Sequence, residues 1–385
     1  MKIIYLDNNA TTSVAPEVYE AMRPFLTESY GNPSSMHTFG GKIKKNIDSA
    51  RISVANLIGA NDTNEIIFTS CGTESDNTAI IGTLRSYPDK KHIITTKVEH
   101  PAVLSLCKYL ETQGYRLTYL DVNSDGALDL NELKSAIDYD TAIISVMHAN
   151  NETGVLFPIE EIAEIARLRG VVFHTDAVQS AGKINLDMKK IPVDLLSLSG
   201  HKLHAPKGVA ALYVRKGTRF SPFLIGGHQE SGRRGGTENV ASIVGLGTAC
   251  ELAKKNMNEE ITQVKKLRDK LENGILEKIT NVRLNGDKEK RLPNTTNIGF
   301  EFIEGESILL KLDEKGIAAS SGSACTSGSL MPSHVLRAMG IPFTFIQGSI
   351  RFSLSRYNRE EDIDYTLEHL PPIIKLLRSI SPYVK

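Results

Sequence analysis

The sequence predicts an α/β protein, in which a large domain with a mostly parallel sheet is followed by a smaller α+β domain. Short apolar runs rich in β-branched residues alternate with segments whose apolar residues return every three or four positions, as strands alternate with helices. Such continuous apolar runs are typical of strands buried on both faces of a parallel sheet. After residue 250 these runs become fewer, which indicates a second unit of a different kind.

Five runs have the length and composition of buried strands. They are residues 65–69, 92–96, 142–147, 171–174 and 194–198. The polar segments that follow them are residues 70–77, 99–101, 148–153, 176–179 and 199–202. Because ligands of parallel sheets bind beyond the carboxyl ends of the strands, we expect these five segments to form one site.

The chain length and the change of pattern predict three parts. Residues 16–250 would form the large domain and residues 251–385 the small one, which residues 1–15 are expected to join. A charged helical stretch from residue 246 to about residue 278 would connect the two domains. An amphipathic helix near residues 360–377 would end the chain.

The composition favours a globular enzyme that acts on small molecules. Of 385 residues, 45 are lysine or arginine and 45 are aspartate or glutamate, so no charge excess suggests nucleic acid or a membrane surface as a partner. No apolar run approaches the roughly 18 residues that a membrane span needs. The short apolar run that ends at Asp7 is unlike a signal or transit peptide. The four cysteines lie far apart, without the close pairs of a zinc or redox motif, which favours a cytoplasmic protein with free thiols.

Lys202 is the first candidate for chemistry, because it follows a buried strand among small residues and next to His201. Desolvation lowers the pKa of a lysine and favours the neutral amine that forms a Schiff base. A solvated loop lysine is the default alternative. Asp176 lies 26 residues earlier, at the end of another strand, where a carboxylate could face the ring nitrogen of pyridoxal phosphate and make the ring an electron sink.

Other polar residues after the strands suit the same cofactor. Gln179 is spaced to reach the phenolic oxygen of the ring. Gly72 and Thr73 open a helical stretch directly after a strand, where backbone N–H groups and a hydroxyl can hold a phosphate, although a Gly-Thr turn alone is weak support. His100 could stack on the ring, whereas a lone histidine before a proline is more often structural.

Two glycine-rich segments lie outside this group. Residues 226–237, which end at Thr237, are too charged and too rich in glycine for a core, so they form either a flexible loop or a close approach to an anion or a second subunit. Residues 320–329 surround Cys325 with small residues that cannot bury it, which favours an accessible nucleophile. Cys71, Cys107 and Cys250 are interpreted as structural.

Arg351 lies in an otherwise apolar strand, where a guanidinium is costly unless an anion pairs with it. A substrate carboxylate held by two hydrogen bonds would supply that anion. A structural salt bridge is the alternative interpretation.

The chain closely resembles the class V, fold type I, pyridoxal-phosphate cysteine desulfurases, and among them the NifS-type branch. The motifs that carry the resemblance are residues 5–12, 31–35, 98–103, 149–154, 200–202 and 320–329. The short segment around Cys325, without a long insertion, is similar to group I of that family. The resemblance implies a fold type I transferase, with a seven-stranded, mostly parallel sheet in the large domain and a small α+β domain. The catalytic cysteine would lie in a loop of the small domain at about residues 320–332.

The resemblance also implies a role for each candidate residue. Lys202 would carry pyridoxal 5′-phosphate as a Schiff base, and Cys325 would receive sulfur as a persulfide. His100 would stack on the ring and act as acid and base. The remaining cofactor contacts would be Gly72, Thr73, Asn151, Asp176, Gln179, Ser199, His201 and, from the other subunit of a homodimer, Thr237. Asn151 and Arg351 would hold the carboxylate of the substrate L-cysteine.

The implied reaction converts L-cysteine to L-alanine and passes the sulfur to an iron–sulfur scaffold protein of the NifU or IscU type. No intrinsic metal site is implied, although Cys325 could transiently share an iron–sulfur cluster with the scaffold. An aminotransferase or selenocysteine lyase of the same fold, or a non-catalytic sulfur-pathway adaptor, are the alternatives. A zinc site of His201, His204 and Cys325 is disfavoured by the lack of close ligand pairs. The sequence leaves open whether the sulfur serves nitrogenase, general iron–sulfur assembly or thiolation.

Overall fold

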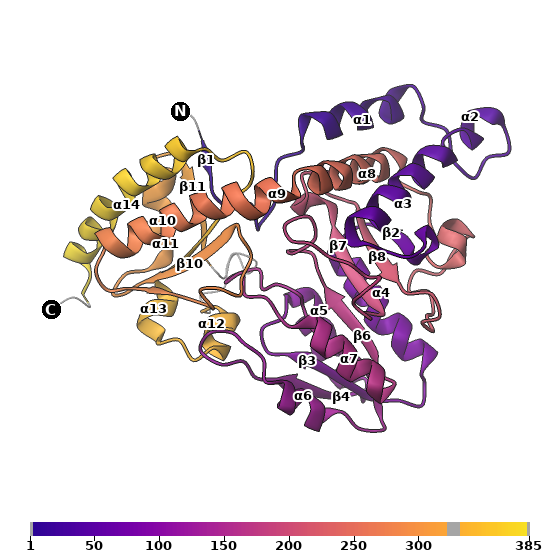
Figure 1. Cartoon of the computed structure of the whole chain (residues 1–385), viewed down its shortest axis with the longest axis horizontal. Coiled ribbons are helices and arrows are strands. Elements are labelled where there is room, and N and C mark those ends of the chain that lie inside the picture. Colours follow the sequence, from indigo (N-terminus) through magenta and orange to yellow (C-terminus); the bar gives the residue numbers. More distant parts are fainter. Residues whose placement is uncertain (1–2, 322–331, 383–385) are drawn as a thin grey trace.

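A seven-stranded sheet forms the centre of the larger part of the molecule, in a computed structural model that describes residues 3–321 and 332–382 (Figure 1). The strands lie in the order β2-β8-β7-β6-β5-β3-β4. They are β2 (Ile66–Thr69), β3 (His92–Thr96), β4 (Arg116–Leu120), β5 (Thr141–Ser145), β6 (Val172–Asp176), β7 (Leu195–Ser199) and β8 (Ala210–Val214). β3 to β7 pair in parallel, and only β8 runs antiparallel to its neighbours β2 and β7. The predicted α/β fold with a mostly parallel seven-stranded sheet is confirmed.

Helices cover both faces of this sheet. They are α1 (Pro16–Thr27), α2 (Thr38–Gly41), α3 (Lys44–Ile58), α4 (Gly72–Ser86), α5 (Pro101–Thr112), α6 (Leu130–Ala136), α7 (Ile159–Arg169) and α8 (Val240–Lys255). Successive strand residues point to opposite faces, so Ile93 and Ile143 belong to one hydrophobic cluster while Ile94 and Ile144 belong to another. This double burial explains why the strands read as continuous apolar runs.

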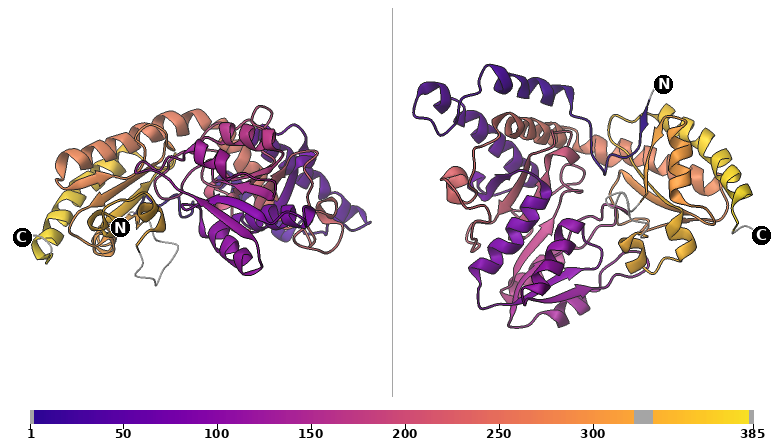
Figure 2. Two further views of the ribbon diagram at one scale, coloured as in Figure 1. Left: turned by 90° about the horizontal axis from the view of Figure 1, so that it is seen from below. Right: turned by 180° about the vertical axis from the view of Figure 1, so that it is seen from behind.

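A second group of elements follows in the chain and lies beside the first (Figures 1 and 2). Its antiparallel sheet has the order β12-β13-β10-β9, made of β12 (Ser320–Ser321), β13 (Ser349–Ser353), β10 (Thr295–Phe300) and β9 (Val282–Leu284). Its helices are α9 (Met257–Glu259), α10 (Lys265–Lys278), α11 (Gly305–Asp313), α12 (His334–Ala338), α13 (Phe343–Gln347) and α14 (Glu360–Ile380). The antiparallel sheet and these helices match the expected α+β character, whereas the boundaries at residues 15 and 250 stay a prediction.

The N-terminal segment connects the two groups. β1 (Ile4–Tyr5) pairs in parallel with β11 (Ile317–Ala318), and Ile4 and Leu6 are buried in the hydrophobic cluster of the second group. The chain then crosses to the first group, where α1 lies beside α8 (Figure 1). Residues 7–12 therefore pass between the two groups, at the place where the site is found.

The charged stretch from residue 246 to about residue 278 is helical, as expected, and it is divided into several helical segments. α8 ends at Lys255, and a turn of π-helix (Glu260–Val264) separates it from α10. Glu260 within this turn is buried, and its carboxylate lies 3.7 Å from Arg356. Within residues 3–321 and 332–382, no helix is both long and apolar enough to cross a membrane.

Candidate active site

A cavity of about 260 Å³ lies where the carboxyl ends of β3, β5, β6 and β7 meet the N-terminus of α4. Most of the predicted cofactor residues line it: Gly72, Thr73, His100, Asn151, Asp176, Gln179, Ser199, His201 and Lys202. The same cavity is lined by Ala10, Cys71, Asp76, Met147, Ala149 and Val178. All five polar segments that follow the predicted strands therefore contribute to one cavity, as the parallel sheet requires.

Lys202 lies in a short 3-10 turn (Gly200–Lys202) directly after β7. Its Nζ donates to the backbone carbonyls of Asn9, at 2.5 Å, and Ala10, at 2.7 Å. The N-terminal segment is fixed over this turn, because the Thr12 N–H donates to the His201 carbonyl at 2.9 Å. The amine is thus held by the segment that crosses between the two groups of elements.

Two buried carboxylates lie at the base of the cavity. Asp176 ends β6, and burial raises its pKa to about 6, although its side chain accepts a hydrogen bond from the Val178 N–H at 2.9 Å. Asp76 projects from α4; burial, followed by the nearby Asp176 charge, raises its pKa well above the usual value. Asp76 Oδ1 has no hydrogen-bond partner among the described residues. The protonated ring nitrogen of a pyridoxal phosphate would reduce the free-energy cost of burying these two acidic groups.

Another part of the cavity lining suits an anion. Gly72 and Thr73 begin the first turn of α4, a 15-residue helix. The first N–H groups of a helix have no partner within the helix, and here Cys71 Sγ caps that of Glu74. A Cβ on Gly72 would come within 3.1 Å of Val178, so a larger residue would crowd this wall. The buried Ser199 hydroxyl, also at this wall, has no partner within the part of the chain that the structure describes. A phosphate would satisfy both the helix terminus and this hydroxyl.

His100 precedes Pro101 and caps α5. Its Nδ1 accepts from the Ala102 N–H at 3.1 Å, so in the neutral ring the proton lies on Nε2. Burial, reinforced by the charge of Lys202, lowers the pKa of His100 to about 4. The imidazole is therefore neutral near pH 7. The lone pair of Nδ1 is used by the Ala102 N–H, and Nε2 carries a hydrogen that it can donate.

A buried polar network surrounds Gln179. Its Nε2 donates to the Asn9 carbonyl at 3.0 Å, and its Oε1 accepts from Lys183 Nζ at 3.1 Å. Lys183 is fully buried, and burial, followed by the charge of Lys202, lowers its pKa to about 7. The contact with Asn9 fixes which way round the Gln179 amide lies, because a carbonyl oxygen can only accept.

Arg351 lies in β13 and is outside the cavity lining, but it is joined to it through Asn151. Its Nη1 donates to the Asn151 carbonyl at 3.0 Å, and its Nη2 pairs with Asp7 Oδ1 at 2.7 Å. The alternative interpretation, a salt bridge within the chain, is therefore what the structure contains. Asn151, the second predicted carboxylate contact, lines the cavity itself.

Cys325, the predicted nucleophile, lies outside the described residues. The described residues on either side of it are anchored near the site. Ser320 pairs with Arg351 across β12 and β13. On the other side, Ser333 Oγ donates to the Glu152 carboxylate at 2.5 Å, and His334 Nε2 contacts the Glu99 carbonyl at 2.9 Å.

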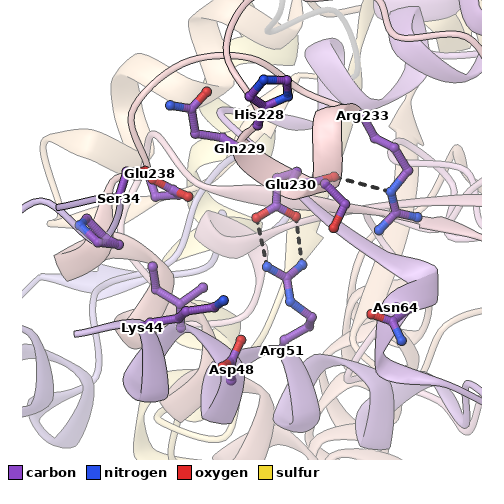
Figure 3. Close-up of a pocket in the computed structure, with 13 residues that line it drawn as sticks. Ser34, Lys44, Asp48, Arg51, Asn64, His228, Gln229, Glu230, Arg233 and Glu238 are labelled. Atoms are coloured by element: carbon purple, nitrogen blue, oxygen red, sulfur yellow. Dashed lines mark hydrogen bonds and ion pairs between the residues drawn. The ribbon is translucent and has the colours of Figure 1, made fainter. Parts of the chain in front are cut away.

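Thr237 is exposed and does not line this cavity. Its segment borders a larger cavity of about 710 Å³ against α3, in which Arg51 forms two hydrogen bonds with Glu230, at 2.6 and 2.8 Å (Figure 3). The same segment is tied to α4, because Arg234 pairs with Glu74 at 2.8 Å. Thr237 is thus not brought to the Lys202 cavity of its own chain, and its assignment to the site of another subunit stays a prediction.

The comparisons with known proteins agree with this geometry. The aminotransferase class-V family model matches residues 4–366. The chain is 61% identical over 383 residues to a cysteine desulfurase of Nostoc sp., covering 100% of this chain and 96% of the relative. The chain belongs to the cysteine desulfurases of the class V aminotransferase family. Cysteine desulfurase NifS of Azotobacter vinelandii is 58% identical over 383 residues, covering 100% of this chain and 95% of that protein.

Two solved structures share the fold. A NifS-like protein superposes with a TM-score of 0.92 at 40% identity, covering 98% of this chain and 100% of that chain. The apo cysteine desulfurase of Thermococcus onnurineus superposes with a TM-score of 0.86 at 27% identity, covering 97% and 95% of the two chains.

Four residues of this cysteine desulfurase site were missed by the sequence reasoning: Asp7, Asn9, Asp76 and Lys183. Asp7 and Asn9 belong to the motif at residues 5–12, which carried the resemblance without a role for either residue. Lys183 follows Gln179 by four positions, a spacing that places two side chains together on a helical turn and was a usable signal. Asp76 lies in the polar segment 70–77 that was expected at the site, but it was given no role of its own, because a carboxylate in the first turns of a helix is ordinarily exposed.

Proposed function

We propose that this cysteine desulfurase uses pyridoxal 5′-phosphate held by Lys202, and that Cys325 takes the sulfur of L-cysteine as a persulfide and releases L-alanine. The observation that carries the proposal is the single cavity that joins the amine of Lys202, the buried carboxyl group of Asp176 and the anion-binding N-terminus of α4. The presence of an amine, an acid and an anion site in one cavity suits the aldehyde, ring nitrogen and phosphate of that cofactor.

The cofactor, when bound, supplies an electron sink that weakens the bonds at the substrate's α-carbon and polarises its carbon–sulfur bond. Lys202 Nζ would be the covalent anchor, and its free amine would be the base that takes the α-proton. Asp176 would hold the proton of the ring nitrogen. The phosphate would be held by Gly72, Thr73, Ser199 and His201, and Gln179 would donate Nε2–H to the phenolic oxygen.

His201 suits the phosphate as a neutral donor. Burial, reinforced by Lys202, lowers its pKa to about 4. Its Nδ1 lies 3.2 Å from the Thr11 hydroxyl, which orients the ring. His100 would cover the ring face, and the Nε2–H of its neutral imidazole would donate a hydrogen bond there.

Sulfur transfer needs no oxidant. The Cys325 thiolate attacks the substrate sulfur, the carbon–sulfur bond breaks, and the substrate β-carbon gains a proton, so one thiol and cysteine give one persulfide and alanine. Arg351 and Asn151 hold the substrate carboxylate during this step. The anchoring of Ser320 opposite Arg351 and of Ser333 on Glu152 supports placing Cys325 near the substrate.

We further propose an iron–sulfur scaffold protein as the sulfur acceptor, in the cytoplasm. We also propose a homodimer, in which Thr237 of one subunit completes the phosphate site of the other. The exposure of Thr237, and the Arg234–Glu74 pair that ties its segment to the phosphate helix α4, support the dimer. Sedimentation of the purified protein tests it, and a monomer that retains cofactor would contradict it.

The decisive experiment for the activity compares Cys325→Ser with Cys71→Ser. Cys71 is exposed and lines the same cavity, but its Sγ caps α4 by accepting from the Glu74 N–H at 3.4 Å, a contact that serine preserves. With L-cysteine and a reductant, wild type and Cys71→Ser should form alanine and sulfide in equal amounts, and Cys325→Ser should form neither at a useful rate. Alanine formation by Cys325→Ser at the wild-type rate would refute the nucleophile, and transfer of the amino group to a keto acid would identify an aminotransferase instead.

A further inference from the structure

The guanidinium of Arg351 is already paired with an anion of the chain itself. Its side chain is 3% exposed, and its Nη2 lies 2.7 Å from Asp7 Oδ1. The remaining Nη1 donates to the Asn151 carbonyl, and the buried Nε has no hydrogen-bond partner among the described residues. One edge of the guanidinium is therefore charge-paired, while another buried donor is left for a ligand.

Backbone hydrogen bonds of the neighbouring residues fix the position of Asp7 beside β13. The flanking Asn8 N–H donates to the Ser353 carbonyl at 3.1 Å, and the Ser353 N–H donates to the Leu6 carbonyl at 2.8 Å. The side chain of Asp7 is 19% exposed, compared with 3% for Arg351. Rotation of one side chain can therefore move the carboxylate toward solvent without moving the segment.

We propose that Asp7 is the resident counter-ion of Arg351, which the carboxylate of the amino-acid substrate displaces when it binds. This inference rests on the proposed role of Arg351 in binding that carboxylate. A buried guanidinium without an anion is costly, and Asp7 removes that cost before substrate arrives. Two carboxylates on one guanidinium repel each other, so the presence of Asp7 lowers the affinity for the substrate carboxylate.

The other acid near Arg351 does not take this role. Glu152 is fully buried and its carboxylate accepts the Ser333 hydroxyl, and burial raises its pKa to about 7. It is thus engaged with a different residue, whereas Asp7 contacts the guanidinium directly. Of these two acids, only Asp7 can therefore act as the counter-ion of Arg351.

Asp7→Asn is the informative variant, because asparagine keeps an oxygen that accepts from Nη2 and removes only the charge. Holoenzyme is titrated by calorimetry with propionate, which carries the carboxylate without the amine, and with ethylamine, which carries the amine without the carboxylate. Asp7→Asn should bind propionate about three- to tenfold more tightly than wild type and ethylamine equally well. Asp7→Glu, which keeps the charge, should bind propionate like wild type.

Asp121→Asn is the matched control, since Asp121 forms an exposed pair with Lys97 at 2.6 Å. This control should leave both affinities unchanged. Unchanged or weaker propionate binding by a folded Asp7→Asn protein, judged by its thermal transition, would overturn the proposal and make Asp7 a purely structural partner. The two proposals can fail separately. If Asp7→Asn binds propionate more tightly while the wild type forms no alanine from cysteine, the proposed function is refuted and the counter-ion role stands.

Discussion

The two ends of the site are built in different ways. At the Lys202 end, the functional side chains follow buried strands of one parallel sheet, and each comes from a segment that a strand pattern already indicates. At the Arg351 end, the guanidinium contacts Asp7, 344 positions away, and Asn151, 200 positions away. Local patterns place the first set of residues, whereas the second set is placed by packing between distant parts of the chain.

The strongest test of the Lys202 end is Lys202→Ala. We expect complete loss of turnover and of the absorbance near 400 nm that a lysine-bound cofactor gives, because the covalent anchor is gone. Lys183 is the second buried amine of this region, and it lies on Asn9 and Gln179. The control Lys183→Met should keep the absorbance band, and a reducible lysine–cofactor bond in Lys202→Ala would show that the anchor is elsewhere.

The corresponding test of the Arg351 end is Arg351→Lys. A point charge replaces a planar group that binds a carboxylate with two hydrogen bonds, so the KM for cysteine should rise roughly tenfold or more, with cofactor absorbance unchanged. Arg116→Lys, at an exposed pair with Asp138, should leave the kinetics as in wild type. If Arg351→Lys matched wild type in steady-state kinetics, the carboxylate would be held by other residues.

Buried acids give a smaller contrast between the ends. Burial raises the pKa of Glu99, behind the Lys202 end, to about 8, and that of Glu152, at the Arg351 end, to about 7. The folded state of each keeps a proton that the unfolded state loses above about pH 4.5, so both lower the stability as pH rises from about 5 to 8. Denaturant unfolding gives the free energy of unfolding at pH 5 and at pH 8. The decrease between the two pH values should be smaller than in wild type by about 2 to 4 kcal/mol in Glu99→Gln, and by less in Glu152→Gln. Equal pH dependence in wild type and Glu99→Gln would mean that Glu99 titrates normally.

The strand pattern was enough to predict the α/β fold and to bring Asp176, Gln179, Ser199 and Lys202 to one cavity. It did not reveal β4, which is partly exposed, or the antiparallel β8. Asp7 and Asn9 could not be assigned roles, because their partners are set by where the N-terminal segment crosses between the two groups of elements. Contacts over such separations carry no local signal in one sequence.

The central claim is that sulfur leaves cysteine on Cys325, and its most direct test is the mass of the cysteine-containing peptides after one equivalent of L-cysteine without reductant. Only the peptide with Cys325 should gain one sulfur, about 32 Da. Cys107 and Cys250 are buried, and burial raises the pKa of Cys107 to about 12, so neither offers a thiolate to the substrate. Cys71 lines the cavity and is the only plausible competitor among the described cysteines. An added sulfur on the Cys325 peptide alone is the predicted result, and an added sulfur on the Cys71 peptide with none on Cys325 would contradict the account.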